Sequence, residues 1–189
     1  MAVNYVEKIR QFTRQELIAM LDKLLAGEAI EEWASGKAFE HVILRAFELE
    51  SATVKWPYRV KDPLGKSQRD MEQIDGAVYH DGMACLIEAK DESGHITIEP
   101  IAKLQYQLSR RPVGALGLMF SINGFTEPAK LLACFAHPMR ILLWEGNELR
   151  VYIERSAMCK ALTLKYRHAV EHSQPEYSAV DELDEEEPV

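Results

Sequence analysis

Two acidic residues and one lysine in the middle of the chain have the types and the spacing of a catalytic site. They are Asp75, Glu88 and Lys90, in the segment MEQIDGAVYHDGMACLIEAK (71–90). Asp81-Gly82 is typical of a two-residue hairpin turn, because both residues tolerate the positive φ that a type I′ turn needs. Counting outward from this turn places Asp75 opposite Glu88. Strand alternation then puts Lys90 on the same side as Glu88, so the sequence predicts one cluster.

Carboxylates that face each other across two strands repel and destabilise the strand pair. A divalent cation would offset this repulsion, and Mg²⁺ is commonly held by one or two carboxylates while it keeps waters for a phosphate substrate. Lys90 could then hold one of those waters. In the alternative interpretation the hairpin end is exposed and Lys90 only neutralises the acids. Spacing alone favours neither, but the apolar neighbours Ile74, Val78, Leu86 and Ile87 indicate a buried hairpin, where unpaired acids are costly.

The segments before the hairpin predict two helices, a strand and a loop. Thr13 to Glu16 form a capping-box pattern, and leucines follow it at helical spacing, which predicts an N-terminal helical extension over residues 1–30. Ser35 is a suitable cap for a second helix from roughly Gly36 to Leu49. Residues Ala52 to Val60 alternate in the manner of a strand. The sequence KDPLGKSQRD (61–70) is rich in Pro, Gly and charge and predicts a loop.

The segments after the hairpin predict alternating helices and buried strands. Pro100 suits the first turn of a helix from Ile101 to Arg110. The apolar run 114–122 is typical of a strand covered on both faces, and Thr126 can cap a helix that reaches about Ala136. A second buried strand is expected at 140–144. A turn at 145–147 would lead from it into 148–153, and residues 160–170 are expected to be helical.

The order of these elements resembles the PD-(D/E)XK nuclease superfamily, in which an Asp is followed after a short gap by Glu-x-Lys on the next strand. The matching residues are Ile74-Asp75, where Ile replaces a frequent Pro, and Glu88-Ala89-Lys90. The resemblance runs from about Ser35 to about Ala136. It is closest to the Mrr-like restriction endonuclease branch, whose strand, Gly turn and helix are similar to FSINGFTEPA (120–129). It implies an α/β fold, a restriction-endonuclease-like mixed central sheet flanked by helices on both faces.

The resemblance also implies roles for individual residues. Asp75 and Glu88 would hold Mg²⁺, for which Mn²⁺ could substitute, and the carbonyl oxygen of Ala89 would be a further ligand. Lys90 would orient the attacking water. Glu40 matches an acid of the preceding helix that often reaches the metal site in this superfamily. From the residues alone, a solvated helix position is the slightly favoured interpretation of Glu40.

Three further residues are expected to contact the substrate. The helix after Glu-x-Lys often contributes a polar side chain in this superfamily, and Gln105 is the candidate, although Gln107 is equally available. Lys66 and Arg69 lie in the loop before the Asp strand and could contact DNA phosphates. Solvated loop charges are the more common explanation for residues of this kind.

Composition does not exclude a nucleic-acid substrate. The chain of 189 residues has a net charge of −8, but seven acids lie between Glu176 and Val189, and the remainder carries 22 basic and 23 acidic residues. Residues 1–172 therefore predict a single domain, followed by a disordered acidic tail at 173–189. The three cysteines are expected to be buried free thiols. Without a signal peptide or a membrane-length apolar run, a cytoplasmic protein is expected.

These observations together predict a Mg²⁺-dependent endonuclease that hydrolyses DNA phosphodiester bonds, in restriction or in DNA defence or repair. DNA is the expected partner, and a homodimer is left open. One alternative is a non-catalytic module of the same fold that binds nucleic acid or a protein. Another is a structural module whose acidic tail binds a basic protein. Retention of Asp75, Glu88 and Lys90 together favours the enzyme.

Overall fold

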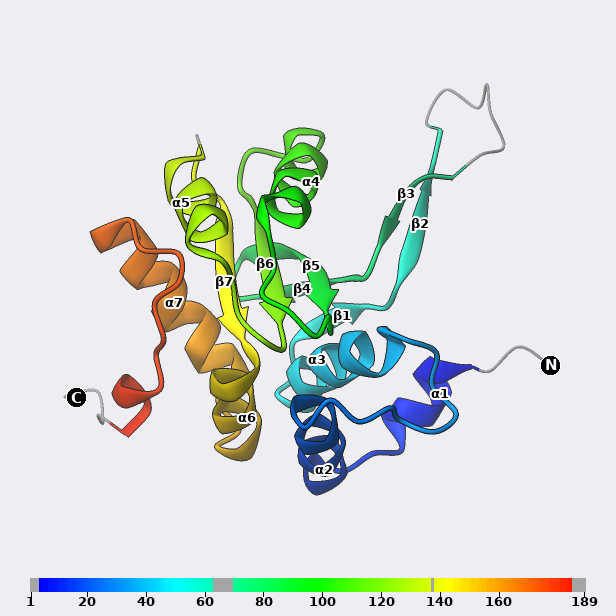
Figure 1. Cartoon of the computed structure of the whole chain (residues 1–189). Helices are drawn as coiled ribbons and strands as arrows, with labels where there is room; N and C mark the ends of the chain where they lie inside the picture. The colour runs from blue at the N-terminus through cyan, green and yellow to red at the C-terminus, as the bar shows by residue number, and fades with distance from the viewer. Residues whose placement is uncertain (1–3, 63–69, 137, 185–189) are drawn as a thin grey trace.

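A mixed five-stranded sheet forms the centre of the molecule, in a computed structural model that describes residues 4–62, 70–136 and 138–184. The strand order is β1-β4-β5-β6-β7 (Figure 1). Neighbours β1, β4 and β5 are antiparallel, whereas β5, β6 and β7 are parallel. The strands are β1 (Thr53–Lys55), β4 (Gly76–His80), β5 (Met83–Lys90), β6 (Ala115–Ser121) and β7 (Ile141–Glu145). The sheet confirms the expected α/β class.

Helices cover both faces of this sheet, as expected. One face carries α3 (Lys37–Leu49), α6 (Gly146–Glu154) and α7 (Met158–His172), and the other carries α4 (Ile98–Ser109) and α5 (Glu127–Phe135) (Figure 1). The expected N-terminal helical extension is two helices, α1 (Tyr5–Arg10) and α2 (Arg14–Leu25), and both pack on α3. No helix among residues 4–62, 70–136 and 138–184 is long and apolar enough to span a membrane.

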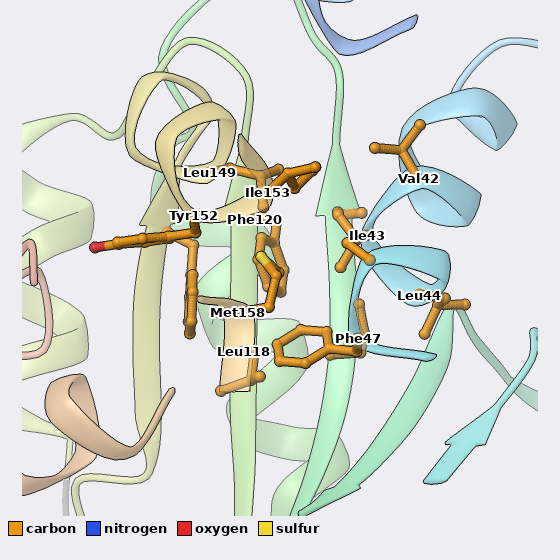
Figure 2. Close-up of a cluster of buried hydrophobic side chains, with 14 of the residues drawn as sticks. Val42, Ile43, Leu44, Phe47, Leu118, Phe120, Leu149, Tyr152, Ile153 and Met158 are labelled. Atoms are coloured by element: carbon orange, nitrogen blue, oxygen red, sulfur yellow. The ribbon is translucent and has the colours of Figure 1, made fainter. Parts of the chain in front are cut away.

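Strand alternation divides the core into two apolar clusters, one on each face of the sheet. Leu118 and Phe120 of β6 point toward the first face, where they meet side chains of α3, α6 and α7 (Figure 2). Met119 of the same strand points to the opposite face, where Leu104 and Leu108 of α4 are buried. A strand that is buried on both sides needs apolar residues at every position, which explains the continuous apolar run of β6.

A separate two-stranded sheet projects from the body (Figure 1). It pairs β2 (Tyr58–Lys61) with β3 (Asp70–Ile74), and only Asp75 separates β3 from β4. The expectation of one strand over residues 52–60 is therefore wrong, because β1 and β2 pair with different partners. Pro57 stands at the break between them, where it offers no backbone N–H to a ladder.

The segment after β7 differs from the sequence expectation. A helix, α6, begins directly at Gly146, where a turn was expected. Glu145 and Glu148 form a capping box, in which the Glu145 N–H donates to the Glu148 carboxylate over 2.9 Å. The apolar positions Leu149, Tyr152 and Ile153 also follow helical spacing. The helix expected at 160–170 is confirmed as part of α7.

The segment 173–184 packs on the body, so the expectation of a disordered tail from Ser173 is wrong for these residues. The Leu143 N–H donates to the carbonyl oxygen of Pro175 over 2.8 Å. Ala179 is fully buried, and its N–H donates to the Tyr152 hydroxyl over 2.8 Å. The buried Lys165 ammonium group donates to the Tyr177 carbonyl oxygen. Apolar residues between the acids make this packing possible, and residues 185–189 lie outside the described part of the chain.

Candidate active site

The β4–β5 hairpin has the register that the sequence predicts. His80 pairs with Met83, and Gly76 pairs with Ile87. Asp81 and Gly82 form the turn with φ values of 45° and 77°, as a type I′ turn requires. Asp75 lies one residue beyond the last pair of the ladder, so it stands across from Glu88.

Asp75 and Glu88 meet where the two-stranded sheet of β2 and β3 joins the central sheet. The Ala89 N–H donates a hydrogen bond to Asp75 Oδ2 over 3.1 Å. Both acids are buried, and the Glu88 side chain is only 1% exposed. Burial, together with the nearby Glu88 charge, raises the pKa of Asp75. The hairpin register and this hydrogen bond bring the two acids together, as the sequence predicts.

Two lysines compensate the charge of Glu88. Lys90 Nζ lies 3.0 Å from Glu88 Oε1, as the alternation of β5 predicts. Lys103 Nζ of α4 lies 2.7 Å from the same oxygen. Burial opposes the charged form of Lys90, but the Glu88 and Asp75 charges outweigh it and raise its pKa, so Lys90 remains an ammonium ion. The second oxygen, Glu88 Oε2, is buried without a hydrogen-bond partner among the described residues.

Lys103 is the site residue that the sequence reasoning missed. Its position on α4 shows no signal of its own, because the rotation of a helix about its axis is set by packing. Gln105, the expected contributor, stands two positions further along, which places it on a different side of the helix from Lys103. Its Oε1 is buried without a hydrogen-bond partner in the described structure, and its contact with the substrate stays a prediction. Gln107 instead donates to the Gln73 carbonyl oxygen over 3.5 Å.

Glu40 lies in the first turn of α3 and faces the same acids. The helix begins at Lys37 with Gly36 as its N-cap, in place of the expected Ser35. The Gly36 N–H donates to Asp91 Oδ2 over 3.0 Å, which fixes the start of α3 beside the end of β5. Burial, followed by the Asp75 charge, raises the pKa of Glu40 to about 7, although Lys37 contacts both carboxylate oxygens at 2.7 Å.

The arrangement fits a divalent cation held by two carboxylates. Within the described ranges, no three His, Cys, Asp or Glu side chains come together as a metal-binding group, so Glu40 does not complete a set with Asp75 and Glu88. Mg²⁺ needs only one or two protein carboxylates, because water completes its coordination. The unpartnered Glu88 Oε2 is a ligand atom of the right chemistry. Lys66 and Arg69 lie outside the described residues.

The sequence matches a known protein family over most of its folded part. The profile of the Mrr-type catalytic domain, described as a restriction endonuclease, matches residues 32–153, which is more than half of the chain. This range includes α3, the β4–β5 hairpin, α4 and β6, and therefore every described site residue. None of the curated proteins matches the chain.

Solved structures with similar folds share little sequence with this chain. Protein VC1899 from Vibrio cholerae has a TM-score of 0.53 and 16% identity, over 90% of this chain and 46% of its own. The MspJI restriction endonuclease in complex with a 27-mer oligonucleotide gives 0.44 and 17%, over 94% and 40%. A type III CRISPR defence DNA nuclease activated by cyclic oligoadenylate gives 0.45 and 15%, over 69% and 23%. The chain thus spans less than half of each of these three proteins, and the likeness to VC1899 supports a shared fold.

Proposed function

The chain belongs to the Mrr-type restriction endonuclease family, and from this premise we propose that it is a metal-dependent endonuclease that hydrolyses DNA phosphodiester bonds. One observation carries the proposal. Asp75 and Glu88 are brought together in a buried position with an unpartnered carboxylate oxygen, and a charged lysine stands beside them. Burying two acids that repel each other lowers the stability of the fold, so the pair is expected to have a functional role.

Asp75 and Glu88 are the proposed ligands of Mg²⁺ or Mn²⁺, with the carbonyl oxygen of Ala89 as a third protein ligand. When bound, such an ion supplies an activated water and stabilises the negative charge that develops on the phosphate. The hydrogen bond from the Ala89 N–H orients the Asp75 carboxylate, so this ligand is in place before any ion arrives. Glu40, which does not group with Asp75 and Glu88 in the described structure, is proposed to support the ion through a water or at a second ion.

Lys90 is proposed to position the attacking water and to stabilise charge on the phosphate. Its ammonium group is held 3.0 Å from Glu88 Oε1, and the side chain is 26% exposed, which leaves access to a substrate. The raised pKa of Lys90 keeps it protonated at neutral pH, so it acts as a hydrogen-bond donor and a positive charge. Holding a water in line with the phosphorus accounts for a large part of the rate of such reactions.

DNA is the proposed substrate, and Lys66, Arg69 and Gln105 remain proposed contacts to it. The first two lie in the sequence between β2 and β3.

A plasmid-nicking assay with Mg²⁺, with Mn²⁺ and with EDTA tests the proposal. The wild-type chain should convert supercoiled plasmid to nicked or linear DNA only with a divalent ion. Glu88→Gln should abolish this conversion. Glu127→Gln, the same change at an exposed position of α5, should leave it intact. An inactive wild-type chain that binds plasmid with and without metal would favour a non-catalytic module.

A further inference from the structure

One carboxylate oxygen, Glu88 Oε1, is contacted by two lysines from different elements. Lys90 comes from β5, two positions after Glu88, whereas Lys103 reaches the oxygen from α4 on the sheet face that α4 covers. The two lysines differ in exposure, since the Lys103 side chain is 51% exposed and that of Lys90 is 26% exposed. The more exposed lysine makes the shorter contact, at 2.7 Å.

A divalent ion on Glu88 would have to displace at least one of these two ammonium groups. Two ammonium groups already neutralise the acid pair, and an added ion of charge +2 would repel both at short range. Lys90 has less room to move away, because only 26% of its side chain is exposed. Lys103 can turn outward by changing side-chain rotamers, because half of it is already in solvent and its stem is flexible.

The exposed face of α4 beside Lys103 carries side chains that could contact a nucleic acid. Tyr106 and Arg110 stand three and seven positions after Lys103, which places all three on one face of the helix. The Tyr106 side chain is exposed, and the Arg110 guanidinium, which pairs with the Glu72 carboxylate, lies 4.0 Å from the centre of its ring. A lysine that leaves Glu88 would therefore lie at the start of a surface able to contact phosphate and sugar.

We propose that Lys103 is a displaceable counter-ion that neutralises Glu88 in the metal-free protein and contacts a DNA phosphate once a divalent ion has taken its place. This inference rests on the proposed metal site. It adds a coupling, because metal binding releases a phosphate ligand and DNA binding in turn favours the metal-bound form. Lys103 is a substrate-positioning residue in this scheme, whereas a purely structural ion pair would release nothing.

Calorimetric titration with Mn²⁺ in the absence of DNA tests the first half. Lys103→Gln should bind Mn²⁺ at least threefold more tightly than the wild type, because no ammonium group must be displaced. Lys103→Arg should stay close to the wild type, and so should Lys130→Gln, a control on α5 outside the site. Unchanged or weaker Mn²⁺ binding by a folded Lys103→Gln variant would overturn the displacement.

Binding to a fluorescent DNA duplex tests the second half, in a Lys90→Ala background that prevents cleavage. Adding Lys103→Gln should weaken DNA binding about threefold or more with Mn²⁺ and leave it unchanged with EDTA. The slope of log affinity against log salt should fall by about one with Mn²⁺ only. An equal loss with and without Mn²⁺ would overturn the transfer to phosphate.

Mn²⁺ binding by the Glu88 and Lys103 variants distinguishes a wrong metal site from a wrong role of Lys103. If Glu88→Gln binds Mn²⁺ as tightly as the wild type, the proposed metal site is wrong and the role of Lys103 falls with it. If Glu88→Gln loses Mn²⁺ binding while Lys103→Gln gains none, the metal site stands and only the displacement is wrong. Melting temperatures of all variants establish that each comparison is made between folded proteins.

Discussion

Asp75 accepts a hydrogen bond from the backbone N–H of Ala89, with 3.1 Å between nitrogen and oxygen. Asp75 belongs to neither β3 nor β4. Its side-chain bond therefore connects the junction between these strands to β5, beyond the end of the β4–β5 ladder. An Asn side chain could still accept the bond through its amide oxygen, whereas Ala could not. Asp75→Asn is therefore the change that removes the charge while it keeps the local structure.

Substitutions of the two acids should reduce both metal affinity and activity, whereas substitution of Lys90 should reduce activity alone. Asp75→Asn and Glu88→Gln each remove a proposed ligand charge, so Mn²⁺ affinity should fall about tenfold or more together with activity. Lys90→Ala removes a cation beside the acids, so Mn²⁺ should bind as well or better, while cleavage falls by about two orders of magnitude or more. Calorimetry and plasmid nicking on the same samples measure both quantities. Wild-type cleavage by Lys90→Ala would refute its catalytic role.

Divalent ions should stabilise the folded protein. Ligands that bind only the native state raise the free energy of unfolding in proportion to the logarithm of their concentration. The melting temperature should therefore rise with Mn²⁺ concentration and return to its starting value with EDTA. The Glu88→Gln variant should show no such rise, whereas Glu127→Gln should behave as the wild type. Identical curves for wild type and Glu88→Gln would place the ion elsewhere.

Gly76 cannot be enlarged without cost, because a Cβ atom there would lie 2.6 Å from Leu44 Cδ2. Both groups are buried where α3 packs on β4, so Gly76→Ala should reduce the free energy of unfolding by about 1–3 kcal/mol. In a Leu44→Ala background the added methyl group gains room, so the two changes should couple by about 1 kcal/mol or more. Urea denaturation measures the cycle. Gly94→Ala, where nothing lies within 4 Å, is the matched control, and an equal loss at both glycines would contradict the steric argument.

Truncation should distinguish the packed part of the C-terminal segment from its end. Removing residues 175–189 takes the Tyr177 carbonyl oxygen from the buried Lys165 and uncovers the site of Ala179. We expect a loss of roughly 2 kcal/mol or more in the free energy of unfolding. Removing only residues 185–189 keeps every described contact of the segment and should leave the melting temperature unchanged. If the longer truncation melted at the same temperature as the full-length chain, this packing would contribute little to stability.

The buried thiols predict an alkaline pH dependence of stability. Burial raises the pKa of Cys85 to about 12, and burial with the Glu50 charge does the same for Cys159. Unfolded thiols ionise near their ordinary value of 9.0, so the unfolded state loses protons first. Stability should therefore fall as the pH rises from 9 toward 12. At pH 8, a thiol reagent should modify the half-buried Cys134 quickly and reach the other two only in denaturant.

The sequence was sufficient to predict the β4–β5 hairpin and the side chains that the hairpin brings together. Asp81-Gly82 permits one tight turn, and the period of two then fixes which side each residue faces, so the meeting of Asp75, Glu88 and Lys90 could be predicted. The strand β6 and the cap of α5 by Thr126 were predictable for similar local reasons. In each case the information lies within one short stretch of the sequence.

What depends on distant packing could not be predicted. Lys103 reaches Glu88 because of the rotation of α4 on the sheet, which no local pattern specifies. The break at Pro57 is visible in the sequence, but the assignment of β1 and β2 to different sheets depends on their partners. The C-terminal acids suggested disorder, whereas the apolar residues between them find buried positions that exist only in the folded body.

The short loop of the β4–β5 hairpin has a consequence for the order of folding. Asp75 and Ala89 are 14 positions apart, and Glu88 and Lys103 are 15 apart, so few residues must be ordered before these contacts form. The contact of Gly36 with Asp91 closes 55 positions and carries α3 and Glu40 with it. Local contacts form sooner than distant ones, so we expect the acid pair and its lysines to assemble early and Glu40 to join late. Mutations in the hairpin should then slow folding, while mutations at the start of α3 should mainly speed unfolding.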